Sequence, residues 1–143
     1  MQTITTQPVI VANGFAFAEN PRWHEGRLWF VDMHGRTIYA LSPDGALEAM
    51  LTTPAAPSGI GFMPDGSMLV VAVHEMKVHR WKDGKLNDYA NLSHLAKAGL
   101  NDMLVDPDGR AYAVQHGFDW RSGDAPVAAA LLTIEPDGSV HEA

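Results

Sequence analysis

The sequence predicts an all-β fold: a β-propeller made of three four-stranded blades of an expected six-bladed ring. Short apolar runs alternate with Asp-Gly or Glu-Gly pairs along the chain, and these pairs recur in sets about forty residues apart. Such pairs supply the positive φ that tight hairpin turns need. Four strands in each unit of about forty residues is the sequence pattern of a propeller blade.

Each unit contains two hairpins that differ in the strand beside the turn. Three turn glycines precede a strongly apolar run and lie 40 and 43 residues apart: Gly26, Gly66 and Gly109. Three others follow a more amphipathic strand: Gly45, Gly84 and Gly138. The apolar runs LWFV and MLVVAV fit strands that are covered on both sides, because the sheets of a propeller stack face to face. No unit carries the 3.6-residue period of a helical repeat.

The chain is therefore predicted to be a single partial propeller over residues 1–143. The three expected blades occupy, in order, about 15–53, 57–92 and 100–143. A strand-like run at 8–13 precedes the first blade. In propellers a leading strand of this kind often completes the last blade and fastens the ring, and we expect that role for this run.

One short helix is expected between the second and third blades, near Asn91–Ala98. Asn91 or Ser93 is placed to cap its N-terminus, and Gly99 is placed to end it. An irregular loop is the alternative for this segment.

Three blades are too few to close a ring, because propellers close with about four to eight blades. Three twisted sheets alone would leave two open faces and exposed strand edges. A C-terminal half of three further blades would close a six-bladed ring, and so would a second copy in a homodimer. We expect the C-terminal half.

Composition excludes several classes of function. Ten basic residues against seventeen acidic ones give a formal net charge of −7, and no run of Lys or Arg forms a stripe. Nucleic acids and anionic membranes are therefore not expected partners. The chain has no Cys, which excludes a disulfide framework, a thiol nucleophile and thiolate zinc sites. No apolar stretch approaches the roughly 18 residues that span a bilayer, and we expect a cytoplasmic protein.

Alignment of the three units indicates a candidate site. Glu19, Ser58 and Asn101 precede their turn glycines by 7, 8 and 8 positions, so they occupy equivalent places in successive blades. Each opens the innermost strand, which lines the central channel. Convergent oxygen donors are what a hard divalent cation such as calcium needs. The alternatives are a solvated carboxylate for Glu19 and a turn or helix cap for Asn101 with Asp102.

His116 follows the inner strands of the third unit, and we expect it near the channel mouth. We predict that it lines the substrate pocket, with Ser58 and Asn101 as the other candidates for substrate contact. A packed or capping histidine is the alternative interpretation.

Three segments carry a resemblance to a known family. They are FAENPRWHEGRLWFVDMHGRTIYALSPDG, APSGIGFMPDGSMLVVAVHEMKVHRW and LNDMLVDPDGRAYAVQHGFD. In order, they resemble the first, second and third blades of the gluconolactonase/regucalcin (SMP-30-like) family of six-bladed propeller lactonases. The resemblance covers essentially the whole chain and corresponds to the N-terminal half of such a ring.

The resemblance implies one divalent cation on the channel axis. Calcium is the first expectation, with zinc, magnesium or manganese as alternatives. By the same resemblance, Glu19 is a metal ligand and Asn101 contacts metal or substrate. Two further family ligands, an Asn and an Asp, come from later blades, and that Asp is the family's candidate general base. No catalytic residue is therefore assigned within these 143 residues.

The expected function is the opening of a lactone or related ester by metal-assisted attack of water. The alternative is a non-catalytic half-propeller that binds a partner, or a self-closing homodimer with an incomplete metal site. Sugar-lactone members of the family carry an Arg two residues before the Asn that matches Asn101. This chain has Gly99 there, so the resemblance does not extend to a preference for sugar acids.

Overall fold

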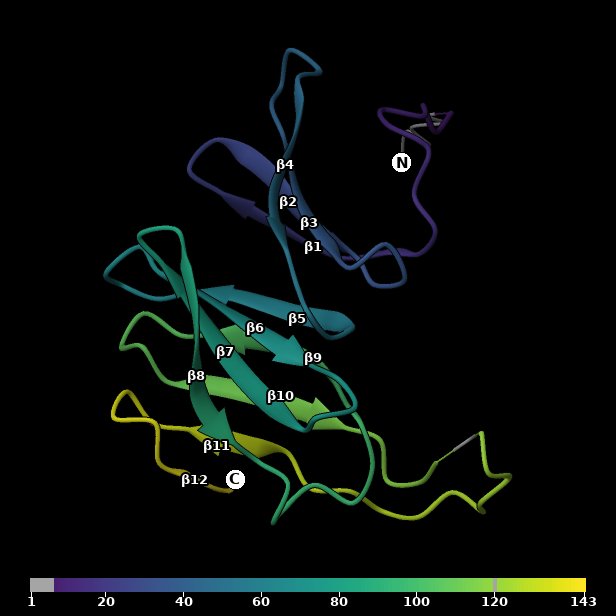
Figure 1. Ribbon diagram of the computed structural model, residues 1–143, viewed down its shortest axis with the longest axis vertical. Coiled ribbons are helices and arrows are strands. Elements are labelled where there is room, and N and C mark those ends of the chain that lie inside the picture. Colours follow the sequence, from purple (N-terminus) through teal and green to yellow (C-terminus); the bar gives the residue numbers. More distant parts are fainter. Residues whose placement is uncertain (1–6, 120) are drawn as a thin grey trace, which may run out of the picture.

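Consecutive strands pair with one another throughout the molecule. A computed structural model describes residues 7–119 and 121–143. Its strands form three sheets of four antiparallel strands each, and Figure 1 shows the sheets following one another down the molecule. The described ranges contain no helix, and accordingly none that is long and apolar enough to cross a membrane. The prediction of an all-β fold with three four-stranded sheets is confirmed.

Each sheet uses four strands that are consecutive in the sequence. Blade 1 consists of β1 (Ala18–His24), β2 (Arg27–Asp32), β3 (Thr37–Leu41) and β4 (Leu47–Thr52). Blade 2 consists of β5 (Pro57–Phe62), β6 (Met68–Ala72), β7 (Lys77–Lys82) and β8 (Lys85–Asn91). Blade 3 consists of β9 (Leu100–Val105), β10 (Ala111–Gln115), β11 (Leu132–Ile134) and β12 (Val140–Glu142). The innermost strands are β1, β5 and β9.

Two kinds of hairpin turn use the acidic-residue–glycine pairs. Asp83 and Gly84 both have positive φ, 51° and 73°, as a two-residue type I′ turn requires, and the β1–β2 turn is of the same kind. The turns at Pro-Asp-Gly place only the glycine at positive φ. In these turns the glycine amide closes the loop, as in the 2.9 Å hydrogen bond from Gly66 N to Met63 O. The pairs therefore act as hairpin turns, as the sequence predicts.

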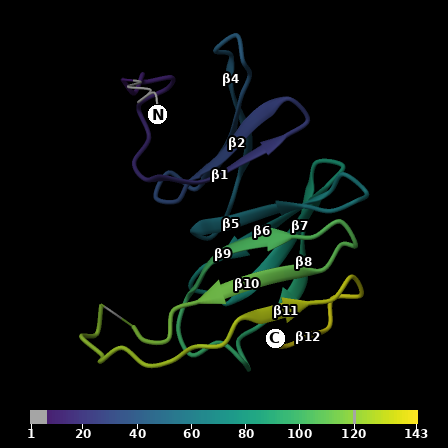
Figure 2. The ribbon, with the colours of Figure 1, turned by 180° about the vertical axis from the view of Figure 1, so that it is seen from behind.

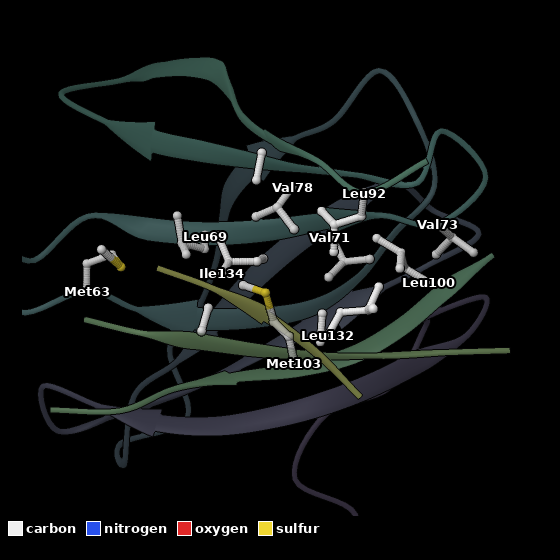
Figure 3. Close-up of a cluster of buried hydrophobic side chains, with 13 residues drawn as sticks. Met63, Leu69, Val71, Val73, Val78, Leu92, Leu100, Met103, Leu132 and Ile134 are labelled. Atoms are coloured by element: carbon white, nitrogen blue, oxygen red, sulfur yellow. The ribbon is translucent and has the colours of Figure 1, made fainter. Parts of the chain in front are cut away.

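β6 shows why the sheets stack. Met68 and Val70 pack in a cluster with side chains of blade 1. Leu69 and Val71 point to the opposite face and pack in a cluster with side chains of blade 3, including Met103 (Figure 3). All of these side chains are buried. The uninterrupted apolar run of β6 therefore reflects a strand that is covered on both faces.

The predicted helix near Asn91–Ala98 is wrong. The segment makes a single turn, closed by a hydrogen bond of 2.8 Å from Ala96 N to Leu92 O. The next amide, that of Lys97, donates instead to the side-chain oxygen of Gln115 at 2.8 Å. The turn cannot extend past this point, and a single turn does not repay the cost of starting a helix.

The run at 8–13 forms no strand in this structure. Val9, Ile10 and Val11 are largely exposed. A few residues later the chain returns to blade 1, where the ring of Phe15 meets that of Phe30 edge-on with centroids 4.9 Å apart. That the run completes the last blade of a ring stays a prediction.

Asp32 holds the segment before β1 against the turn after β2. Its carboxylate accepts hydrogen bonds from the backbone amides of Ala16, Phe17 and Gly35 at 3.0, 2.8 and 3.1 Å. Burial of Asp32 opposes its ionisation, but these three donors and the nearby His34 outweigh that effect and hold its pKa below the ordinary value. A side chain at position 35 would overlap the Asp32 carboxylate, so glycine there makes the close contact feasible.

We expect Asp32→Ala to lower the free energy of unfolding by about 1–3 kcal/mol, because three amides lose their acceptor. Since the folded-state pKa is lowered, this contribution is complete above the unfolded value of 3.8 and is lost as the pH falls through the folded value. Urea denaturation at neutral pH and in steps below about pH 4 measures it. Asp108→Ala, at an exposed turn residue, is the control. A difference that does not shrink on acidification would contradict the assignment.

Candidate functional site

Each innermost strand carries a one-residue bulge at the same place. Between the two paired positions that flank each bulge, the innermost strand moves on by three residues and its neighbouring strand by two. The bulged segments are 19–22 in β1, 57–60 in β5 and 100–103 in β9. A bulge bends its strand and re-aims the local side chains, and bulges are common beside active sites.

The three residues aligned from the sequence lie in these bulged segments. Glu19, Ser58 and Asn101 are each the second residue of an innermost strand. Ser58 Oγ donates to Asn101 Oδ1 at 3.2 Å, so these two side chains are in direct contact. Glu19 makes no hydrogen bond to either of them in the described contacts. Its Oε1 is buried and has no hydrogen-bond partner among the described residues.

Two further polar side chains join this group, and neither was predicted from the sequence. Asn20 is buried and has a φ of 53°. In the amide orientation that satisfies both of its polar groups, its nitrogen donates to Asp102 Oδ2 at 3.1 Å. Its oxygen lies 3.2 Å from Ser58 Oγ, whose single hydroxyl proton is shared between this oxygen and Asn101 Oδ1. We call Glu19, Asn20, Ser58, Asn101 and Asp102 the axial cluster. By strand register Asn20 is the equivalent of Ser58 and Asn101, because Glu19 is the paired residue before its bulge, as Pro57 and Leu100 are before theirs. Glu19 also lines the hollow on the outer face of blade 1.

Arg22 links blade 1 to blade 3 beside the axial cluster. Its Nη2 forms an ion pair with Asp102 Oδ1 and donates to the backbone oxygen of Met103 at 2.8 Å. Its Nη1 donates to Pro21 O at 3.0 Å. Both charged side chains are partly exposed, so the ion pair itself adds little stability. Its effect is to hold the Asp102 carboxylate in one place.

Gly59 allows β5 and β9 to approach each other closely. A Cβ at this position would overlap the backbone of Asn101, Asp102 and Met103. The close approach brings Ser58, the residue before Gly59, within hydrogen-bond distance of Asn101. Gly59, in the bulge of β5, is therefore needed for the contact between Ser58 and Asn101.

His116 lies apart from the axial cluster, in a pocket of about 580 Å³. The pocket is formed by the β6–β7, β8–β9 and β10–β11 loops, together with Met33. Figure 2 shows the long β10–β11 segment projecting from blade 3. The ends of β6 and β10 pair with the first residues of β5 and β9, so the pocket opens at the end of the blades where the axial cluster begins. Glu19, Ser58 and Asn101 do not line it.

The donor atoms of the aligned residues suit a hard cation. They are a carboxylate, a hydroxyl and an amide oxygen, the ligand types that calcium prefers. Glu19 Oε1 is buried and has no hydrogen-bond partner among the described residues. A bound cation would satisfy such an oxygen. These residues would fill only part of a shell of about six to eight ligands. Within 7–119 and 121–143, no group of three or more His, Cys, Asp or Glu side chains forms a ready-made metal site.

Comparison with protein families identifies the class of protein. The family model described as "SMP-30/Gluconolactonase/LRE-like region" matches residues 17–143. The chain therefore belongs to the SMP-30/gluconolactonase/LRE-like family. A comparison with curated proteins found no match.

Solved structures with the same fold include a gluconolactonase from Xanthomonas campestris, with a TM-score of 0.75, 20% identity and coverage of 92% of this chain and 48% of that one. A virginiamycin B lyase from Staphylococcus aureus has a TM-score of 0.66 and 19% identity, covering 91% and 42%. Regucalcin from Agrobacterium tumefaciens, described as a calcium-binding protein, has a TM-score of 0.63 and 20% identity, covering 85% and 43%. This chain spans about half the length of these proteins. At such identities the likeness shows the fold alone.

We expect Gly59→Ala to destabilise the protein by about 1–3 kcal/mol, because the added methyl group meets backbone that cannot turn aside. Gly99→Ala is the matched comparison. Its Cβ would lie 3.1 Å from a methyl group of Val73, and a side chain can yield. Thermal unfolding of both variants measures the difference. Equal stability of the two variants would contradict the close approach of β5 and β9.

Proposed function

We propose that this chain supplies three blades of a divalent-metal-dependent hydrolase of the lactonase type. The observation that carries the proposal is the convergence of the three bulges, where Ser58 contacts both Asn101 and Asn20, and where the residue before Asn20, Glu19, has a buried and partnerless Oε1. Membership of the SMP-30/gluconolactonase/LRE-like family supports the lactonase class. The description of the similar regucalcin as a calcium-binding protein supports calcium as the ion.

In this proposal Glu19 and Asn101 hold the cation through oxygen atoms. The buried, partnerless Oε1 of Glu19 supports its role. When bound, a divalent cation supplies Lewis-acid polarisation to an acyl carbonyl. Calcium is favoured because all of the proposed donors are oxygens, and zinc, magnesium and manganese are the alternatives to be compared with it.

The substrate is proposed to be a small lactone or related ester. In its hydrolysis, water adds to the acyl carbon, the ring C–O bond breaks, and a proton is transferred to the departing ring oxygen. Ser58 engages Asn101 Oδ1, which orients the amide and leaves its Nδ2 group as a donor for a substrate oxygen. Asn20 and Arg22 together fix the Asp102 carboxylate beside it. No residue of this chain is assigned as the general base.

Ring closure is part of the proposal. The outer face of blade 1 has an apolar hollow lined by Phe15, Leu28 and Phe30, among others. The outer face of blade 3 exposes Leu104 and Val114, by 54% and 39%. The corresponding faces between the blades are buried. We propose that a C-terminal half with three further blades covers both outer faces. The similar solved structures, about twice as long as this chain, support this.

We expect the 143-residue protein alone to associate through its outer faces, and Leu104→Lys to shift it toward the monomer of 15.5 kDa. Native mass spectrometry at micromolar concentration measures the species. Leu47→Lys, on the outermost strand β4, is the control and should change nothing. Open-ended oligomers agree with a C-terminal half as the natural cover. A discrete dimer would show that a second copy closes the ring, and a wild-type monomer unaffected by Leu104→Lys would contradict both.

We expect Glu19→Gln to weaken calcium binding at least about tenfold, because a charged ligand becomes neutral. Isothermal titration calorimetry with calcium alone measures the affinity, and titrations with zinc, magnesium and manganese identify the preferred ion. Glu142→Gln, an exposed residue of β12, is the matched control. In a ring completed by the proposed C-terminal half, the same substitution should abolish lactone hydrolysis in a pH-stat assay. Unchanged cation affinity in Glu19→Gln would contradict the assignment of Glu19 as a cation ligand.

A further inference from the structure

Asn20 is the residue of blade 1 that the structure brings into contact with the other two innermost strands. It is only 9% exposed, and its side chain lies between Ser58 of β5 and Asp102 of β9. By register it is equivalent to Ser58 and Asn101, although counting along the sequence selects its neighbour Glu19. The contacts of Asn20 therefore bear on which residues of blade 1 face the proposed cation.

The backbone of Asn20 is in the left-handed region, with a φ of 53°. Of the five described non-glycine residues with positive φ, Asn20 alone lies within a strand, and the other four lie in turns or loops. Glycine adopts this conformation most readily, and asparagine is among the few other residues that tolerate it. Because glycine would fit the backbone better, the presence of asparagine points to a role for its side-chain amide.

Ser58 lies between two amide oxygens that compete for its proton. Ser58 Oγ is 3.2 Å from Asn101 Oδ1 and 3.2 Å from the side-chain oxygen of Asn20. A hydroxyl group has one proton, so it serves one of the two oxygens at a time. No other donor of the described residues forms a hydrogen bond with either oxygen. A cation that both oxygens coordinate would remove this shortage of donors.

Asp102 determines which end of the Asn20 amide faces Ser58. Its Oδ2 accepts from the Asn20 nitrogen at 3.1 Å, and Arg22 holds its Oδ1. An ionised carboxylate only accepts hydrogen bonds, so the Asn20 nitrogen turns toward Asp102 and the oxygen toward Ser58. Outer hydrogen-bonding groups commonly orient the ligands of a metal ion in this way.

We propose that Asn20 is a ligand of the divalent cation through its side-chain oxygen, together with Asn101. The inference rests on the proposed function, which supplies the cation. It adds a ligand from blade 1 that neither the alignment of the repeats nor the family resemblance assigns. The amide oxygens of Asn20 and Asn101 are neutral donors, and Glu19 supplies the negative charge.

The test compares two substitutions of Asn20 by calorimetry with calcium alone, on the 143-residue protein. Asn20→Gly suits the positive φ but removes the oxygen, so calcium affinity should fall at least about tenfold. Asn20→Asp keeps an oxygen in place and adds a negative charge, so calcium should bind it at least as tightly as the wild type. Asp83→Gly, in the exposed β7–β8 turn with a φ of 51°, is the matched control and should retain wild-type affinity.

Thermal unfolding in EDTA distinguishes a cation ligand from a residue that only supports the fold. Asn20→Gly should lower the melting temperature by at most about 4 °C, because water can replace the lost donor at Asp102, whose side chain is 47% exposed. Asn20→Asp places a second carboxylate beside Asp102 and loses the donor to it. This variant should therefore unfold at a lower temperature in EDTA, and calcium should raise its melting temperature by more than that of the wild type.

Three outcomes would each overturn the proposal. They are wild-type calcium affinity in Asn20→Gly, a loss in Asn20→Asp as large as that in Asn20→Gly, and a wild type that does not bind calcium. If Glu19→Gln weakens calcium binding while Asn20→Gly does not, this inference fails and the proposed function stands. If calcium binding depends on Asn20 but a completed ring does not hydrolyse lactones, the proposed function fails and the assignment of Asn20 stands.

Discussion

Face-to-face burial of consecutive sheets is the constraint on which the rest of this structure depends. β6 is apolar on both faces because one face packs on blade 1 and the other on blade 3. This stacking sets β1, β5 and β9 beside one another and so brings residues more than forty positions apart into contact, as Ser58 and Asn101 show. The same constraint accounts for the outer faces of blades 1 and 3. Each outer face carries apolar side chains, as the buried faces between the blades do, but no further blade covers it in this structure.

The bulges convert this stacking into a polar site. The bulges place Asn20, Ser58 and Asn101 at equivalent unpaired positions. The residue that follows is Asp102 in β9 and Gly59 in β5, where no side chain would fit. The resulting group is asymmetric and rich in oxygen donors. The fold by itself does not decide the reaction, since a virginiamycin B lyase shares it with a gluconolactonase. The donor chemistry of the axial cluster, together with family membership, is what favours a metal-dependent lactonase.

Local patterns in the sequence predict most of the fold and part of the site. Turn glycines and the two-sided apolar run of β6 are local signals. Counting back from the glycines aligns Glu19 with Ser58, whereas the register aligns Asn20, because the β1–β2 turn is shorter than the turn between β5 and β6. The helix prediction failed because the backbone amide of Lys97, which would continue the turn, donates instead to the side chain of Gln115, a residue distant in sequence. The contact of Asn20 with Asp102 could not be predicted either. A bulge leaves no periodic signal, and the pairing of blades 1 and 3 appears only once the sheets are stacked.

The central claim is that the axial cluster binds one divalent cation. Paramagnetic line broadening by substoichiometric Mn²⁺ tests it directly through the side-chain amide signals of the asparagines in an NMR spectrum. The account predicts strong broadening of Asn101 and Asn20 at low Mn²⁺, reversed by excess calcium, with the signal of Asn87 on the outer strand β8 unaffected. Broadening of Asn87 as early as that of Asn101, or no selective broadening of Asn101 and Asn20, would contradict it.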